Sequence, residues 1–154
     1  QLVNPEELID RALSEAPAGT IDENVTVNID SSVPRIVADP EPACEAITYL
    51  LKYLGSLEGG ELNLSVQEEQ HPSLGRSVSV IISRRAARPQ LDVDELFDPF
   101  HALERSNGDL GPAISRRIID NQGGQVDADL SNGELKMRIV FPITVLDTVS
   151  APEE

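Results

Sequence analysis

The stretch PAISRRIIDNQGGQVDADLSNGELKMRIVF, residues 112–141, contains the most regular pattern of the chain. Pro112 stands where a helix tolerates proline best, in its first turn, and apolar residues follow at helical spacing until Gly123-Gly124. Apolar and polar residues then alternate on both sides of Asn132-Gly133, a dipeptide typical of two-residue hairpin turns. The stretch therefore predicts a helix followed by two strands, each with one apolar face. The second strand, which ends at Phe141, is expected to be the longest of the chain.

Two further helices are predicted upstream of this stretch. One begins at Asn4-Pro5 and ends before Pro17, and the other begins at Asp39-Pro40 and ends at Gly55. Three alternating segments predict strands at residues 25–29, 62–66 and 78–82, and a polar connection is expected at residues 70–75.

This order of elements predicts an α+β fold. Strands with a single apolar face need a cover on that face alone, and three amphipathic helices can supply it. We therefore expect a two-layer sandwich in which a mixed, mostly antiparallel sheet is covered by three helices on one face. One domain is expected over residues 1–143, followed by a frayed tail at 144–154.

Composition excludes several classes of function. A net charge of -15 among 154 residues would repel nucleic acids and anionic membranes. Cys44 is the only cysteine, which excludes an internal disulfide and a thiolate metal cluster, and its apolar surroundings predict a buried side chain. The two histidines lie far apart and indicate no metal site. No apolar run approaches the roughly 20 residues that span a bilayer, so we expect a cytoplasmic protein.

Four short motifs follow one another in the second half of the chain. They are Glu95–Phe100, Leu110–Ser115, Asp120–Gly124 and Met137–Ile143. In this order and spacing they resemble the ATP-binding domain of sensor histidine kinases, and the resemblance extends over about Asn4 to Ile143. The first resembles the F box of that family, the second its second glycine box, the third its helix end with a glycine pair, and the fourth its closing strand.

The resemblance implies a magnesium site on the helix that begins at Asp39-Pro40. In the family an asparagine of this helix holds Mg²⁺, which in turn holds the triphosphate. Here Tyr49 and Tyr53 take the two asparagine positions. Mg²⁺ requires hard oxygen ligands, and a neutral phenol is a poor one. We therefore expect that the metal ligand is lost.

The resemblance also implies a glycine-rich site for the nucleotide, and this part of the sequence departs from the family as well. Arg84 falls at or beside the position of the aspartate that accepts a hydrogen bond from adenine, and arginine has no acceptor. Ala86 and Arg88 stand where glycines are expected. Asp109 replaces another glycine and would repel phosphate, although Gly111 is retained. These departures predict that neither ATP nor Mg²⁺ binds.

A group of arginines in an otherwise acidic chain is the remaining candidate site. Arg76, Arg84, Arg85 and Arg88 either form a solvated surface or bind an anion or an acidic partner, such as a phosphorylated loop of another protein.

Three functions follow from these observations. The leading hypothesis is a non-catalytic module of two-component signalling that binds a response regulator, a kinase helical domain or a second copy of its own chain. The first alternative is a divergent but active kinase domain, in which Asp92, Asp94 or Asn107 replaces the missing ligands. The second is a sensor that binds a small molecule in the altered cavity.

Overall fold

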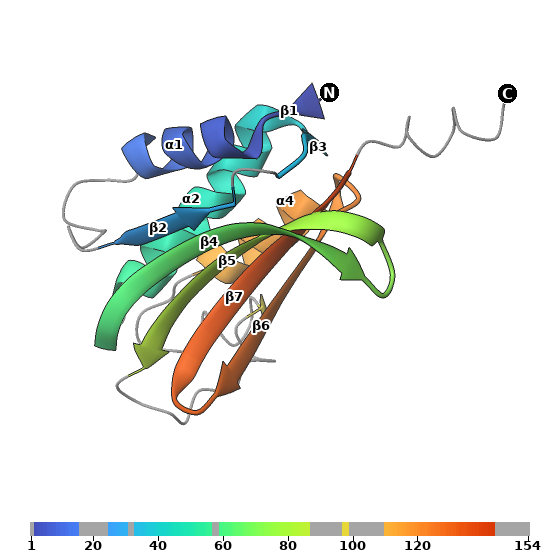
Figure 1. Ribbon diagram of the computed structural model, residues 1–154. Helices are drawn as coiled ribbons and strands as arrows, with labels where there is room; N and C mark the ends of the chain where they lie inside the picture. The colour runs from blue at the N-terminus through green and yellow to red at the C-terminus, as the bar shows by residue number, and fades with distance from the viewer. Residues whose placement is uncertain are drawn as a thin grey trace, which may run out of the picture.

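The computed structural model describes residues 2–15, 25–30, 33–56, 59–86, 97–98 and 110–143. Within them, three helices lie on one side of a curved five-stranded sheet (Figure 1). The predicted two-layer α+β sandwich is therefore confirmed. In chain order the elements are β1 (Leu2–Val3), α1 (Pro5–Glu15), β2 (Thr26–Ile29), β3 (Ile36–Val37), α2 (Pro40–Ser56), β4 (Gly59–His71), β5 (Gly75–Ala86), α4 (Gly111–Asp120), β6 (Gln125–Ser131) and β7 (Glu134–Pro142).

The large sheet has the strand order β2-β4-β5-β7-β6. Its pairs are antiparallel except for β2 and β4, which run parallel. β5 lies at the centre, and β6 and β2 form the two edges. The predicted mixed and mostly antiparallel character of the sheet is thus confirmed.

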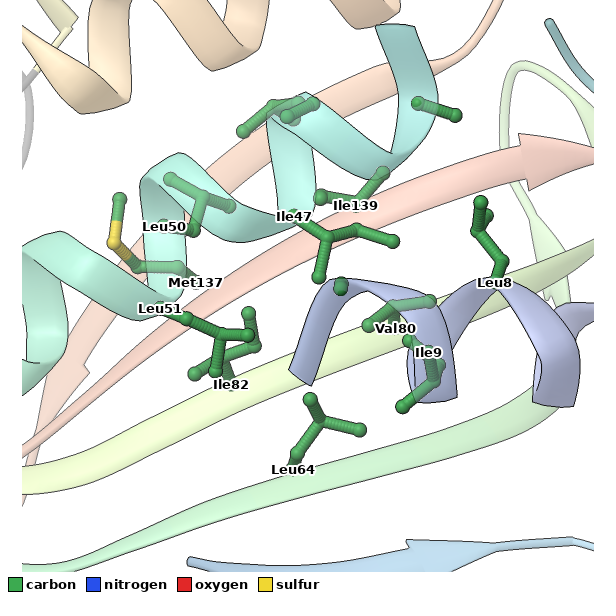
Figure 2. Packing of buried hydrophobic residues seen from close by; sticks show 14 of the residues in the cluster. Leu8, Ile9, Ile47, Leu50, Leu51, Leu64, Val80, Ile82, Met137 and Ile139 are labelled. Carbon is green, nitrogen blue, oxygen red and sulfur yellow. The ribbon is translucent and has the colours of Figure 1, made fainter. Parts of the chain in front are cut away.

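The core fills the layer between the sheet and the helices. Ile47 and Leu51 of α2 and Ile9 of α1 are completely buried, and they meet the apolar faces of the central strands (Figure 2). The strands contribute alternate residues to this layer because successive side chains of a strand point to opposite faces. They include Leu62, Leu64, Val66, Val78, Val80, Ile82, Leu135, Met137, Ile139 and Phe141.

The start of α1 and the end of α4 have the caps that the sequence predicts. The Asn4 side chain accepts a hydrogen bond from the Glu6 amide (2.9 Å). At the C-terminal end of α4, Gly123 adopts a positive φ of 84°, and the Gly124 amide donates to the Ile119 carbonyl (3.0 Å). A Cβ on Gly124 would lie 2.5 Å from the Val140 carbonyl oxygen, so only glycine fits at this contact between α4 and the sheet.

Two details of the large sheet differ from the prediction. Half of the polar stretch at residues 70–75 belongs to strands, because β4 runs to His71 and β5 begins at Gly75, and the turn is confined to residues 72–74. Cross-strand pairs explain this extension, because the side chains of Arg76 and Glu68 form an ion pair. β4 and β5 are consequently longer than β7, and the expectation that β7 is the longest strand is wrong.

A second, two-stranded sheet was not predicted. β1 pairs antiparallel with β3, and Ile36 of β3 also bridges to Ile143 just after β7. Both strands have only two residues, which is too short for a recognisable alternation. In the part of the chain that the structure describes, no helix is long and apolar enough to cross a membrane. The predicted tail at 144–154 lies outside the described residues.

Candidate functional site

Two hydrogen bonds connect the end of α4 to the start of α2, the two helices that carry most of the candidate site. After the end of α4, the side-chain amide of Gln122 accepts a hydrogen bond from the Asp39 amide (3.0 Å) and donates one to the Asp39 carbonyl (3.3 Å). Asp39 directly precedes α2, and the two helices pack against each other, so they run antiparallel from this clamp. At about 1.5 Å per residue, Tyr49 of α2 and Gly111 at the start of α4 reach a similar level along the pair.

The two tyrosines lie on successive turns of α2. Tyr53 is buried, with 5% of its surface exposed, and belongs to the hydrophobic core. Tyr49 is half-buried. The spacing of four residues places both side chains on the same side of the helix.

Arg84 closes the opposite end of α2. Its side chain leaves β5 on the face that the helices cover and is 9% exposed. Its Nη1 atom donates to the carbonyls of Leu54 (2.9 Å) and Gly55 (3.4 Å), in the last turn of α2. The last carbonyls of a helix have no partner within the helix, and a cation there also complements the helix dipole. Arg84 is therefore a C-terminal cap of α2.

The other described arginines of the group lie elsewhere. Arg85 points to the opposite face of β5, and its Nη1 atom donates to the carbonyl of Asn132 in the β6–β7 turn (3.0 Å). Arg76 lies at the far end of β5, eight residues from Arg84, and pairs with Glu68. Arg88 lies outside the described residues. The described arginines thus take three separate places, and the structure does not bring them together as one anion site.

The glycine-box positions are described only in part. Ala86 is the last residue of β5, and Gly111 is a buried residue in the first turn of α4. Asp109 lies outside the described residues, as do Asp92, Asp94 and Asn107. Leu110 is the N-cap residue of α4, and among the described residues it makes no side-chain capping hydrogen bond.

Arg116 connects α4 to two neighbours. Its Nε and Nη2 atoms donate to the Val126 carbonyl (3.2 and 3.0 Å), and its guanidinium lies 3.9 Å from the centre of the Phe97 ring. Phe97 is half-buried and packs against the core. The sequence alone indicates no role for Arg116 or Gln122, because each acts through a partner that is distant in sequence or belongs to the backbone.

A cluster of polar residues links α1 to α2. The Cys44 thiol donates to Glu15 (3.5 Å), which also receives a hydrogen bond from Arg11 (3.0 Å). Burial raises the pKa of Cys44, and the carboxylate of Glu15 raises it further. The pKa of Glu15 is lowered by its hydrogen bonds with Arg11 and Cys44. Cys44 is completely buried, as predicted, and this environment keeps it a thiol.

The face of the sheet without helices carries a second polar cluster. Arg138 of β7 reaches Glu69 of β4 (3.3 Å) and Asp127 of β6 (3.2 Å), so it ties three strands together. Burial alone would lower the pKa of Arg138, but Asp127 and Glu69 raise it above its usual value. Among the residues that the structure describes, no three histidine, cysteine, aspartate or glutamate side chains lie close enough together to hold a metal ion.

Comparison with solved structures identifies the architecture. Acinetobacter baumannii histidine kinase AdeS matches with a TM-score of 0.69 at 15% identity, over 94% of this chain and 67% of that one. A mycobacterial sensor histidine kinase, MprB, matches with 0.67 at 20% identity, over 92% and 96%. A nucleotide-free catalytic domain of histidine kinase ThkA matches with 0.68 at 18% identity, over 92% and 96%. The chain has the histidine-kinase ATPase-domain fold.

Sequence comparison supports this assignment over part of the chain. The sensor protein CutS, from Streptomyces coelicolor and from Streptomyces lividans, is 34% identical over 76 residues, which are 45% of this chain. The chain spans 18% of the length of these curated relatives. No protein-family model matches the chain.

Within the histidine-kinase fold, the candidate site is formed by α2, the end of β5 and the start of α4, and α2 contacts both of the other elements. The resemblance implies that the metal ligand lies on α2, the adenine acceptor after the strand predicted at residues 78–82, and the second glycine box at the start of α4. The structure adds the partners of Arg84, which connect the end of β5 directly to the end of α2.

Proposed function

We propose that this domain is a non-catalytic histidine-kinase ATPase-like module, which acts in two-component signalling through protein contacts and not through ATP chemistry. The observation that carries the proposal is the engagement of Arg84 with the last carbonyls of α2.

Arg84 opposes nucleotide binding in two ways. Its guanidinium has donors only, so it has no acceptor for the adenine amine. Its nearly complete burial against Leu54 and Gly55 also ties it to the frame of the domain. A hydrogen bond to a charged group contributes about 1.5–3 kcal/mol, so moving the side chain aside for a base would cost a comparable amount.

The tyrosines of α2 support the same proposal. Tyr53 packs in the core, which leaves its phenol poorly placed to act as an oxygen ligand of Mg²⁺. Tyr49 is bulkier than the family's asparagine and stands on the same side of α2, at the level of the start of α4. These features of Tyr49, Tyr53 and Arg84 support the proposal, because such side chains do not fit the nucleotide and the Mg²⁺ that the fold family binds.

The proposed role is regulatory docking. The fold and the similarity to CutS, which is named a sensor protein, favour a partner from two-component signalling. The candidates remain a response regulator, the helical domain of a kinase, or a second copy of this chain.

Isothermal titration calorimetry of the purified chain with Mg-ATP tests the proposal. We expect no binding heat up to millimolar nucleotide. The matched control is the triple variant Tyr49→Asn, Tyr53→Asn, Arg84→Asp, which restores the family's side chains and should bind more tightly if it folds. Submillimolar binding by the unaltered chain would refute the proposal and would favour the divergent kinase.

A further inference from the structure

The strand β6 forms one edge of the large sheet. In the described part of the chain no strand lies beyond β6, and seven of its residues pair with β7 on the other side. β2, at the opposite edge, has only four residues. Among the strands that the structure describes, β6 therefore forms the longer open edge of the sheet.

The hairpin turn determines which backbone groups of β6 point outward. Asn132 and Gly133 have φ angles of 54° and 78°, which characterise a two-residue type I′ turn. In such a hairpin Ser131 and Glu134 form a hydrogen-bonded pair, and bonded and non-bonded pairs alternate from there. Val126, Ala128 and Leu130 fall in non-bonded pairs, so their amides and carbonyls face away from β7.

Arg116 provides independent support for this orientation. Its guanidinium donates two hydrogen bonds, of 3.0 and 3.2 Å, to the Val126 carbonyl, which faces away from β7. The amides of Val126, Ala128 and Leu130 and the carbonyls of the last two remain directed outward. They form a regular row of donors and acceptors, which is what an added strand requires.

The side chains of β6 specify the chemistry of such a strand. On the helix-covered face, Ala128 and Leu130 are half-buried apolar residues at the margin of the core. On the other face, Asp127 and Asp129 stand opposite Arg138 and Lys136 of β7. The acidic residues of β6 are thus paired with basic residues of β7 on one side. Basic residues of an added strand, on the other side of β6, would pair with the same acidic residues.

We propose that the β6 edge binds an extended segment of a partner protein in which apolar and basic residues alternate, and that this segment adds a sixth strand to the sheet. The apolar side chains would cover Ala128 and Leu130. The basic side chains would lie beside Asp127 and Asp129, and the net charge of -15 would attract the segment. This inference does not depend on the loss of the nucleotide site.

A second copy of the chain is a poor occupant of this edge. The antiparallel register that pairs the whole of β6 with itself sets Asp127 opposite Asp129 twice. Like charges placed directly opposite each other destabilise a strand pair. The two aspartates therefore select against self-pairing and in favour of a basic strand.

Fluorescence polarisation with a labelled, N-acetylated Val-Lys-Val-Lys-Val-Lys peptide tests the proposal. The valine amides would face the edge, so a peptide with N-methylated valines keeps the charge but loses the backbone pairing. We expect saturable binding of the first peptide and at least about tenfold weaker binding of the second, as the loss of several hydrogen bonds implies. Equal binding of both peptides, or binding of neither, would overturn the proposal.

Two variants of the protein complete the experiment. Ala128→Pro removes an outward amide without touching the ladder to β7, a position where edge strands accept proline, and it should weaken binding as much as N-methylation does. Ala128→Val keeps the amide and should bind like the unaltered chain. The comparison of the two peptides on the unaltered chain remains decisive if Ala128→Pro does not fold.

Discussion

At the scale of single residues, Arg84 and Arg85 show how neighbours in a strand take different roles. Their side chains leave opposite faces of β5, so Arg84 is buried against α2 and Arg85 is exposed beside the β6–β7 turn. From the sequence both belonged to one group of positive charge. Because successive side chains of a strand point to opposite faces, the two arginines separate once β5 extends to Ala86. A strand that ended at residue 82, as the sequence predicts, would not have separated them.

Replacing Arg84 by methionine tests its role as a cap. We expect Arg84→Met to lower the free energy of unfolding by about 1–3 kcal/mol, because the carbonyls of Leu54 and Gly55 lose a charged donor at a buried site. Arg85→Met is the matched control, since the same atoms are removed from an exposed position, and it should cost less than about 1 kcal/mol. Urea unfolding followed by circular dichroism gives both values. Equal losses would contradict the assignment of Arg84 as a buried cap.

At the scale of elements, the sequence predicts the helices and long strands but not their connections. Alternation and helical spacing identified α1, α2, α4 and the five strands of the large sheet, because these elements each have one apolar face. β1 and β3 were missed because two residues have no periodicity. Tyr49 and Tyr53 lie on α2, the helix predicted for them, but Arg84 was expected after the strand at residues 78–82 and instead lies within β5. No pattern within the sequence could reveal that Arg84 caps a helix 30 residues earlier.

The clamp formed by Gln122 is the connection between elements that can be tested most directly. Gln122→Ala should lower the free energy of unfolding by about 0.5–1.5 kcal/mol, because two hydrogen bonds to the Asp39 backbone are lost at a partly exposed site. Amide hydrogen exchange should become faster at the start of α2. Gln122→Glu is the informative control, since it keeps an acceptor for the Asp39 amide but loses the donor to its carbonyl. Unchanged exchange in Gln122→Ala would show that α2 and α4 are joined by core packing alone.

At the scale of the whole molecule, repulsion between the like charges of the chain acts against the stabilisation that the apolar core provides. The buried layer is mostly apolar, whereas the chain as a whole carries an excess of acidic residues that gives it a net charge of -15. The ion pairs of Arg138 and Arg76 neutralise only a few of these groups. Self-repulsion therefore destabilises the compact state, and it also favours partners that bring positive charge.

Screening this repulsion should stabilise the domain. Raising NaCl from about 10 mM to 150 mM shortens the Debye length from about 30 Å to about 8 Å, which suppresses repulsion between distant carboxylates more than attraction within close ion pairs. We expect the melting temperature in differential scanning calorimetry to rise by a few degrees, equivalent to roughly 1 kcal/mol. KCl should have the same effect, because screening depends on ionic strength and not on the identity of the cation. A fall in the melting temperature with salt would mean that attraction within the ion pairs of Arg138, Arg76 and Arg11 outweighs the repulsion due to the net charge. The acidic surface would then no longer count as a source of attraction for a basic strand at β6.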